Sequence, residues 1–159
     1  MLIEVKVGAL IMDPNSSSPI VVLKGVDSET ILPIWVGSYE ANAIALEIEK
    51  IVPQRPMTHD LLRNMIAQLN YRLQKIIVTD LADNTFYAVL ELIDGAGELI
   101  VLDARPSDAI ALALRADCPI FVTRKVLDLS NASSATTAKG AGEVEESPKS
   151  IEDWPDVIG

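Results

Sequence analysis

The 159-residue chain has little of three residue types that carry much of protein chemistry: one cysteine, one histidine and 4% aromatic residues. Cys118 alone excludes an intramolecular disulfide, and one His with one Cys excludes a zinc site built from these two types. No apolar run is long enough to span a membrane and no secretory signal is evident, so we expect a cytoplasmic protein without a membrane partner. Because 49% of the residues are hydrophobic, the expected core is aliphatic.

Basic residues are also scarce, since 13 Lys and Arg oppose 23 Asp and Glu and give a net charge of -10. Residues 130–159 hold two Lys and six acidic residues, which leaves a net charge of -6 on residues 1–129. A protein that grips duplex nucleic acid through its phosphates normally carries a basic surface. The composition therefore argues against strong non-specific binding of nucleic acid, although divalent cations held by carboxylates can supply positive charge.

The pattern of apolar residues predicts strands and helices that alternate in groups along the chain. Strands are expected at 1–12, 20–23, 30–36, 72–81, 85–93, 98–102 and 119–123. Helices are expected at 38–51 with Ser38 as cap, at 58–70 with Thr58 as cap, and at 106–115, with a short helical turn at 126–129. One apolar stripe is expected on the second helix: Leu61, Leu62, Met65, Ile66 and Leu69.

These elements predict one α+β domain over residues 1–129, a mostly antiparallel or mixed sheet with helices packed on it. Residues 130–159 are rich in Ser, Ala, Thr, Gly and Glu, so we expect an acidic, disordered C-terminal tail. Ala43-Ile-Ala-Leu46 aligns with Ala109-Ile-Ala-Leu112, and the preceding strands then align without a gap. This agreement suggests an internal duplication of a strand-turn-helix unit, and chance similarity between short helices is the alternative.

The stretch Asp103–Arg115 combines a strand end, a fixed turn and an almost uncharged helix. The aliphatic run Glu98–Leu102 predicts a buried strand that ends at Asp103, and Pro106 suits the first helical position. No side chain from Ala109 to Leu114 is polar, so this helix should be covered on more than one side, by a sheet and by another helix or subunit. Together with the apolar helix at 41–46, it predicts a homodimer or larger homo-oligomer.

The start of this helix is the sharpest candidate site. Asp103, Arg105, Ser107 and Asp108 fall within one turn of a helix N-terminus, where free N–H groups and the helix dipole favour an anion. Two Arg-Pro dipeptides, at Arg55 and Arg105, each precede a helix, so both guanidinium groups are predicted to converge on one anion. The alternative is that Arg105 forms a structural ion pair with Asp103 or Asp60.

The sequence Asp-Ala-Arg-Pro-Ser-Asp-Ala-Ile-Ala-Leu-Ala-Leu-Arg at 103–115 resembles the signature of the bifunctional nuclease domain family. Three further blocks agree in the same order: Pro33–Gly37 followed by Glu40-Ala41, Arg55–Leu61 and Thr85–Leu90. The resemblance covers roughly residues 1–129. It implies a nuclease that acts on RNA and DNA, and a metal-assisted phosphodiesterase mechanism with Mg²⁺ or Mn²⁺.

The candidate residues follow from that reaction class and from position. Any catalytic triad must use the only histidine, although the helix dipole opposes its protonation and a simple helix cap is the alternative. The catalytic candidates are Asp103, Asp108, His59 and Asp60; the phosphate-binding candidates are Arg55, Arg105 and Ser107; and the metal-ligand candidates are Asp103, Asp108 and Glu40. No organic cofactor is expected. A non-catalytic oligomeric binding or regulatory module remains the alternative function.

Overall fold

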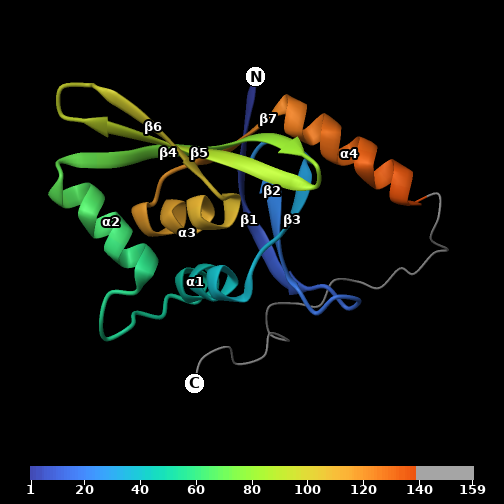
Figure 1. The fold of residues 1–159 in the computed structure, drawn as a ribbon, viewed down its shortest axis with the longest axis horizontal. Coiled ribbons are helices and arrows are strands. Elements are labelled where there is room, and N and C mark those ends of the chain that lie inside the picture. Colours follow the sequence, from blue (N-terminus) through green and yellow to red (C-terminus); the bar gives the residue numbers. More distant parts are fainter. Residues whose placement is uncertain (139–159) are drawn as a thin grey trace.

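A computed structural model of the chain describes residues 1–138, in which seven strands form one mixed sheet (Figure 1). The strands are β1 (Leu2–Met12), β2 (Pro19–Gly25), β3 (Ile31–Trp35), β4 (Tyr71–Ala82), β5 (Thr85–Asp94), β6 (Leu99–Ala104) and β7 (Ile120–Thr123). Their order is β3-β2-β1-β7-β4-β5-β6, and all neighbours are antiparallel except β4 and β7. The helices are α1 (Ser38–Ile48), α2 (Thr58–Gln68), α3 (Pro106–Ala116) and α4 (Arg124–Ala138). The predicted α+β class is confirmed.

The hairpin of β4 and β5 follows from its turn residues. Asp83 and Asn84 form a two-residue turn with φ of 51° and 60°, the left-handed geometry that matches the twist of paired strands. Asp and Asn tolerate this geometry better than most residues, so the sequence specifies the register of the hairpin. The turn of this hairpin lies near β3 and the start of α3, and its residue Asn84 lines a hollow that is described below.

Helix α3 is a core helix, as its composition predicts. Ala109, Ile110, Ala111, Leu112 and Ala113 are all buried. The helix contacts α1, α2, β4 and β5, and Figure 1 shows α1, α2 and α3 grouped together. The predicted cover on more than one side is confirmed, and other elements of the same chain provide it. The burial of α3 therefore gives no reason of its own to expect a second subunit.

Both predicted caps at the starts of α1 and α2 are wrong. Gly37 occupies the cap position of α1, and Ser38 is the first helical residue. Met57 precedes α2, and its backbone N–H donates to the Asp60 carboxylate at 3.0 Å, so Thr58 is not the cap. A carboxylate at the third position of a helix reaches back in this way to the N–H of the residue that precedes the helix, as in a capping box.

Two apolar segments expected to be buried lie on the surface of the chain. Strand β6 is at the edge of the sheet and pairs only with β5 among the described strands, so Leu99, Ile100, Val101 and Leu102 are exposed. The expected stripe of α2 is also mostly exposed: Leu61, Leu62, Met65 and Leu69 are open, and Ile66 is half-buried. The run of apolar residues identified the strand and helix correctly but could not indicate which face another element would cover.

Helix α4 continues to Ala138, past the short turn predicted at 126–129. The boundary at residue 129 between domain and tail therefore falls inside a helix, and the remainder of the predicted tail, 139–159, lies outside the described residues. A three-stranded meander followed by a helix occurs twice in the chain, as β1-β2-β3-α1 and, with α2 between the two units, as β4-β5-β6-α3. The internal duplication itself stays a prediction. No helix of the described residues is long and apolar enough to cross a membrane.

Candidate functional site

A cleft of about 570 Å³ lies between α1, the start of α2, β6 and α3. Glu40, His59, Asp103, Arg105, Asp108 and Arg115 all line it. The end of β6 and the three helices thus bring together these six residues from three stretches that are far apart in the sequence. Five of the six are charged or titratable candidates from the sequence, and Arg115 is an addition.

His59 and Asp108 form the central contact of the cleft, with 2.9 Å between His59 Nε2 and Asp108 Oδ1. Burial by itself would raise the pKa of Asp108, but hydrogen bonds from Arg105 and His59 outweigh burial and hold that pKa below its ordinary value of 3.8. An ionised carboxylate can only accept, so neutral His59 must carry its proton on Nε2. Nδ1 then keeps a lone pair that can accept a proton, although the whole residue is only 8% exposed.

Arg105 bridges two carboxylates at the start of α3. Its Nε donates to Asp108 Oδ2 at 2.8 Å, and its Nη2 donates to Glu40 Oε1 at 2.6 Å. These two bonds raise the pKa of Arg105 above its ordinary value. The side chain is 67% exposed, and Nη1 has no partner among the described residues. Arg105 does form ion pairs, as the structural alternative predicts, but its partners are Asp108 and Glu40 rather than Asp103 or Asp60.

The approach of Glu40 to Arg105 depends on Gly37, the residue that precedes α1. A Cβ atom at this position would collide with the Glu40 carboxylate. The backbone of Gly37 is extended, with φ of -75°, so the glycine serves close approach rather than an unusual dihedral angle. The Gly at this point of the chain therefore has a role that only the folded contact reveals.

Asp60 does not line the cleft, but its carboxylate pairs with Arg115, which does. Arg115 Nε donates to Asp60 Oδ1 at 2.8 Å, while Nη1 and Nη2 donate to the carbonyls of Ala111 and Ala43 at 2.9 and 3.0 Å. The Arg115 side chain is 1% exposed. One guanidinium thus connects α1, α2 and α3. The signal for Arg115 in the sequence was the single polar side chain in the last turn of an otherwise apolar helix.

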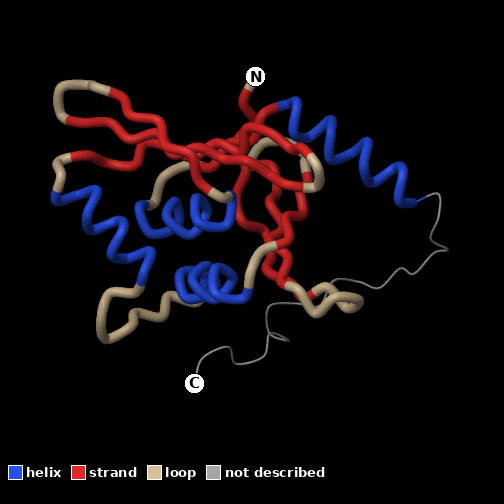
Figure 2. The backbone as a smooth tube through the Cα atoms, viewed as in Figure 1, coloured by secondary structure: helices blue, strands red, loops and turns tan. Residues whose placement is uncertain are grey.

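The remaining predicted residues are not gathered at one point. Asp103 lines the cleft and pairs with Val89 in the sheet, but its side chain forms no hydrogen bond or ion pair with another described residue. Ser107 is buried and lines a neighbouring hollow instead. Arg55 is exposed in the loop between α1 and α2 (Figure 2). It lines neither cavity, so it does not lie in the cleft beside Arg105. The predicted convergence of the two arginines is therefore not observed.

The metal-ligand candidates do not form a ready-made site. Within residues 1–138, no three His, Cys, Asp or Glu side chains are grouped so that they could hold a metal ion. Glu40 and Asp108 are engaged with Arg105, and Asp103 stands apart from both contacts. Burial raises the pKa of the Cys118 thiol to about 11, so this residue is not an activated nucleophile.

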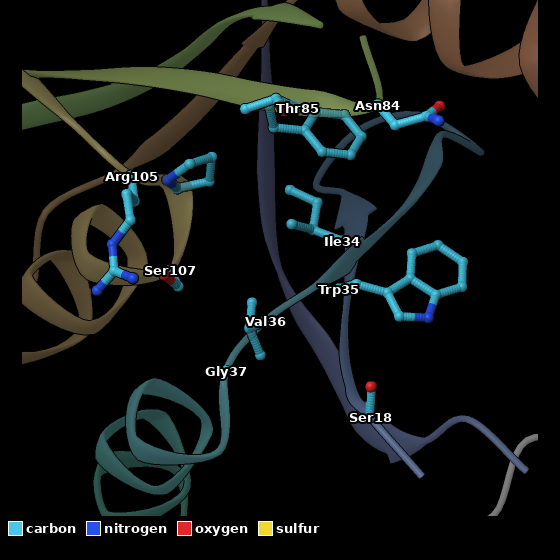
Figure 3. A pocket seen from close by; sticks show the side chains of 11 residues that line it. Ser18, Ile34, Trp35, Val36, Gly37, Asn84, Thr85, Arg105 and Ser107 are labelled. Carbon is cyan, nitrogen blue, oxygen red and sulfur yellow. The ribbon is translucent and has the colours of Figure 1, made fainter. Parts of the chain in front are cut away.

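A second hollow of about 350 Å³ adjoins the first at Arg105, which lines both. It lies between β3, the turn between β4 and β5, and the start of α3. In Figure 3, Arg105 and Ser107 border one side, and Trp35 and Asn84 the other. Trp35 is 54% exposed, and its Nε1 donates to Asp13 Oδ2 at 3.0 Å.

Comparison with known proteins identifies the family. A model of the bifunctional nuclease domain matches residues 21–135. An uncharacterised protein of Mycobacterium tuberculosis is 40% identical over 151 residues, which cover 90% of this chain and 89% of that protein. Bifunctional nuclease 1 of Oryza sativa subsp. indica is 31% identical over 67% of this chain, and that of Arabidopsis thaliana is 29% identical; the matched regions span about a third of each plant protein. This chain belongs to the bifunctional nuclease domain family.

Proposed function

We propose that this protein is a nuclease that hydrolyses phosphodiester bonds of RNA and DNA in the cleft between α1, α2 and α3. The observation that carries the proposal is the 2.9 Å contact of His59 with Asp108 beside the Arg105 guanidinium. Membership of the family and the plant relatives named bifunctional nucleases support the reaction class. One cleft therefore holds three groups that suit the hydrolysis of a phosphodiester. They are a base, His59, the carboxylate that orients it, Asp108, and a cation that can bind an anion, Arg105.

His59 acts as the general base in this proposal. Nδ1 accepts a proton from water while the water oxygen forms a bond to phosphorus, and the bond from phosphorus to the leaving oxygen breaks. Ionised Asp108 stabilises the imidazolium that results and fixes the orientation of its ring. The same imidazolium then returns the proton to the leaving oxygen. Proton balance is complete with this one histidine.

Arg105 holds the phosphate through its unpaired Nη1 and stabilises the charge that develops on the phosphoryl oxygens. Arg115 cannot assist, because its charge is taken up by Asp60. Glu40, Asp103 and Asp108 thus oppose one available guanidinium, and the excess negative charge repels a phosphodiester. We therefore propose that activity depends on Mg²⁺ or Mn²⁺, on grounds of charge rather than of a pre-built set of ligands, with Asp103 as the carboxylate that is free to bind the ion.

The test compares His59→Gln and Asp108→Asn with the wild type and with Asp27→Asn, a matched control at an exposed position outside the cleft. Each protein is purified identically and assayed on single-stranded and duplex RNA and DNA, with EDTA, Mg²⁺ or Mn²⁺. We expect both cleft variants to lose about a hundredfold or more in kcat, as losses of a base or its orienting acid usually do. Equal rates in all four proteins would assign the activity to a contaminant.

A second candidate function is a non-catalytic oligomeric binding or regulatory module. The specific observations in its favour are the exposed apolar side chains of β6 and those of α2, since apolar side chains gathered on the surface of a soluble protein mark interaction sites. We propose that these side chains join copies of the chain into a homodimer or larger assembly, whether or not the protein is a nuclease. If nuclease activity is lost when contaminants are removed while the protein remains a stable oligomer, the non-catalytic module is favoured.

A further inference from the structure

We propose that the second hollow, between β3, the β4–β5 turn and the start of α3, binds an unpaired nucleobase of a single-stranded nucleic acid. This inference rests on the proposed function, since it places the base beside the phosphate held by Arg105. The hollow has a volume of about 350 Å³, within the range of small-molecule sites. Because Arg105 lines both hollows, a nucleotide bound there has its phosphate at the boundary with the His59 cleft.

The charge around the hollow distinguishes it from the rest of the molecule. Arg105 is the only charged residue among those that line it, although the whole chain has a net charge of -10. The neighbouring cleft, in contrast, is lined by Glu40, Asp103 and Asp108. The residues that line the hollow therefore include no carboxylate, and the Asp13 carboxylate beside Trp35 already accepts the Nε1–H of that ring.

The aromatic residues supply a surface for stacking. Trp35 is 54% exposed on the edge strand β3, and Phe86 also lines the hollow. The hydrogen bond from Trp35 to Asp13 fixes the indole, so little freedom remains to be lost when a base stacks on it. Every nucleobase presents a π-face, so such a surface suits single strands of varied sequence. A single exposed aromatic residue needs no functional explanation, but this ring lines the same hollow as the phosphate-binding candidate.

Polar groups at the rim can contact the edge of a base. Asn84 lies at the left-handed position of the β4–β5 turn, with φ of 60°, and its amide can both donate and accept. An amide side chain pairs well with the donor and acceptor edge of adenine. Thr85 and Ser18 add hydroxyl groups to the lining. The hollow thus offers an aromatic ring for the face of a base, polar groups for its edge and a guanidinium for its phosphate. A base that is stacked and paired in a duplex could use neither the ring nor the polar groups.

The binding test uses fluorescence of the full chain with Trp154→Phe, which leaves Trp35 as the only tryptophan. Adenosine 5′-monophosphate should quench this fluorescence with saturation, because the base stacks on the indole. Ribose 5-phosphate, which lacks the base, should leave it nearly unchanged. Equal quenching by both probes would reveal a phosphate site without a base subsite, and no quenching by either would exclude the hollow as a nucleotide site; either result overturns the proposal.

The kinetic test uses Trp35→Ala on a single-stranded oligonucleotide, with Trp35→Phe as the conservative variant and Tyr87→Ala as the control at an exposed aromatic residue outside both hollows. We expect Trp35→Ala to raise KM at least about fivefold with little change in kcat, and Trp35→Phe to restore most of the loss. Circular dichroism and light scattering check that the fold and the assembly are kept. An unchanged KM, or a change of assembly with Trp35→Ala, contradicts the base subsite while the nuclease proposal stands. If the wild type has no nuclease activity, the nuclease proposal is contradicted. The fluorescence test alone then decides whether the hollow binds a nucleobase.

Discussion

Arg115 Nε and Asp60 Oδ1 lie 2.8 Å apart in an ion pair whose arginine side chain is 1% exposed. The same Asp60 carboxylate accepts the backbone N–H of Met57 and so fixes the first turn of α2. His59 belongs to that turn and contacts Asp108 on α3. The Arg115–Asp60 pair therefore joins α2 and α3, the same two helices that carry His59 and Asp108, and holds them in place for the candidate catalytic contact.

Replacing Arg115 by methionine should cost roughly 3–5 kcal/mol in the free energy of unfolding, because Asp60 is left as a buried charge without its partner. Urea denaturation measures the loss. Arg124→Met is the matched control, since Arg124 and Asp128 form a pair in which both side chains are more than 60% exposed, and its cost should stay under about 1 kcal/mol. Similar losses in both variants would mean that burial adds nothing to the Arg115 pair.

The stability contributed by Asp60 should depend on pH. Burial alone would raise the pKa of Asp60, but hydrogen bonds from Met57 and Arg115 outweigh it and lower that pKa below 3.8. A carboxyl group with a lowered pKa in the folded state stabilises the protein above its unfolded pKa, and this stability is lost as pH falls through the folded value. The advantage of the wild type over Asp60→Asn should thus be full near neutral pH and shrink below 3.8. Unfolding measured at several pH values checks this, and an advantage that grows in acid would contradict it.

Arg105→Lys should weaken nuclease activity while stability changes little. One ammonium group cannot replace a guanidinium that contacts Asp108, Glu40 and a phosphate at once. Arg105→Ala should cost about 1–3 kcal/mol of stability, because the Glu40 and Asp108 side chains, 14% and 27% exposed, lose the guanidinium that they share. Kinetics and urea denaturation on the same two variants separate the roles. A destabilised Arg105→Ala beside a fully active Arg105→Lys would remove Arg105 from the phosphate site.

Val101→Lys should break or weaken the proposed homo-oligomer. Val101 is 54% exposed in the middle of the edge strand β6, and a lysine there disfavours pairing with another strand edge. Light scattering should give a mass above the 17.2 kDa monomer for the wild type and a lower mass for the variant. Lys24→Glu on β2 changes charge away from β6 and serves as control. A monomeric wild type at micromolar concentration contradicts the proposal.

Sequence patterns predicted the elements well because each depends on local features. The Asp83-Asn84 turn specifies the β4–β5 hairpin, and Pro106 marks the first residue of α3. The apolar run of residues 109–114 predicted a core helix, and those side chains are buried except for the half-buried Leu114. Local chemistry was enough for these features, since turn geometry and helix starts involve only neighbours along the chain.

The contacts of the site could not be predicted in the same way. Asp60 pairs with Arg115 and Arg105 with Glu40, across 55 and 65 residues of sequence. Which acid meets which arginine depends on how α1, α2 and α3 pack, and every candidate acid sits near a helix start. The exposure of β6 depends likewise on its place at the edge of the sheet, which no property of its own residues determines.

The place of β7 has a consequence for the order in which the chain assembles. This short strand comes late in the sequence, yet it lies in the middle of the sheet, antiparallel to β1 and parallel to β4. Until Ile120–Thr123 has left the ribosome, the two meanders lack the strand that joins them. Such late, long-range pairing slows folding and leaves strand edges open to other chains. Expression conditions that give the nascent chain time, such as low temperature, should therefore raise the soluble yield.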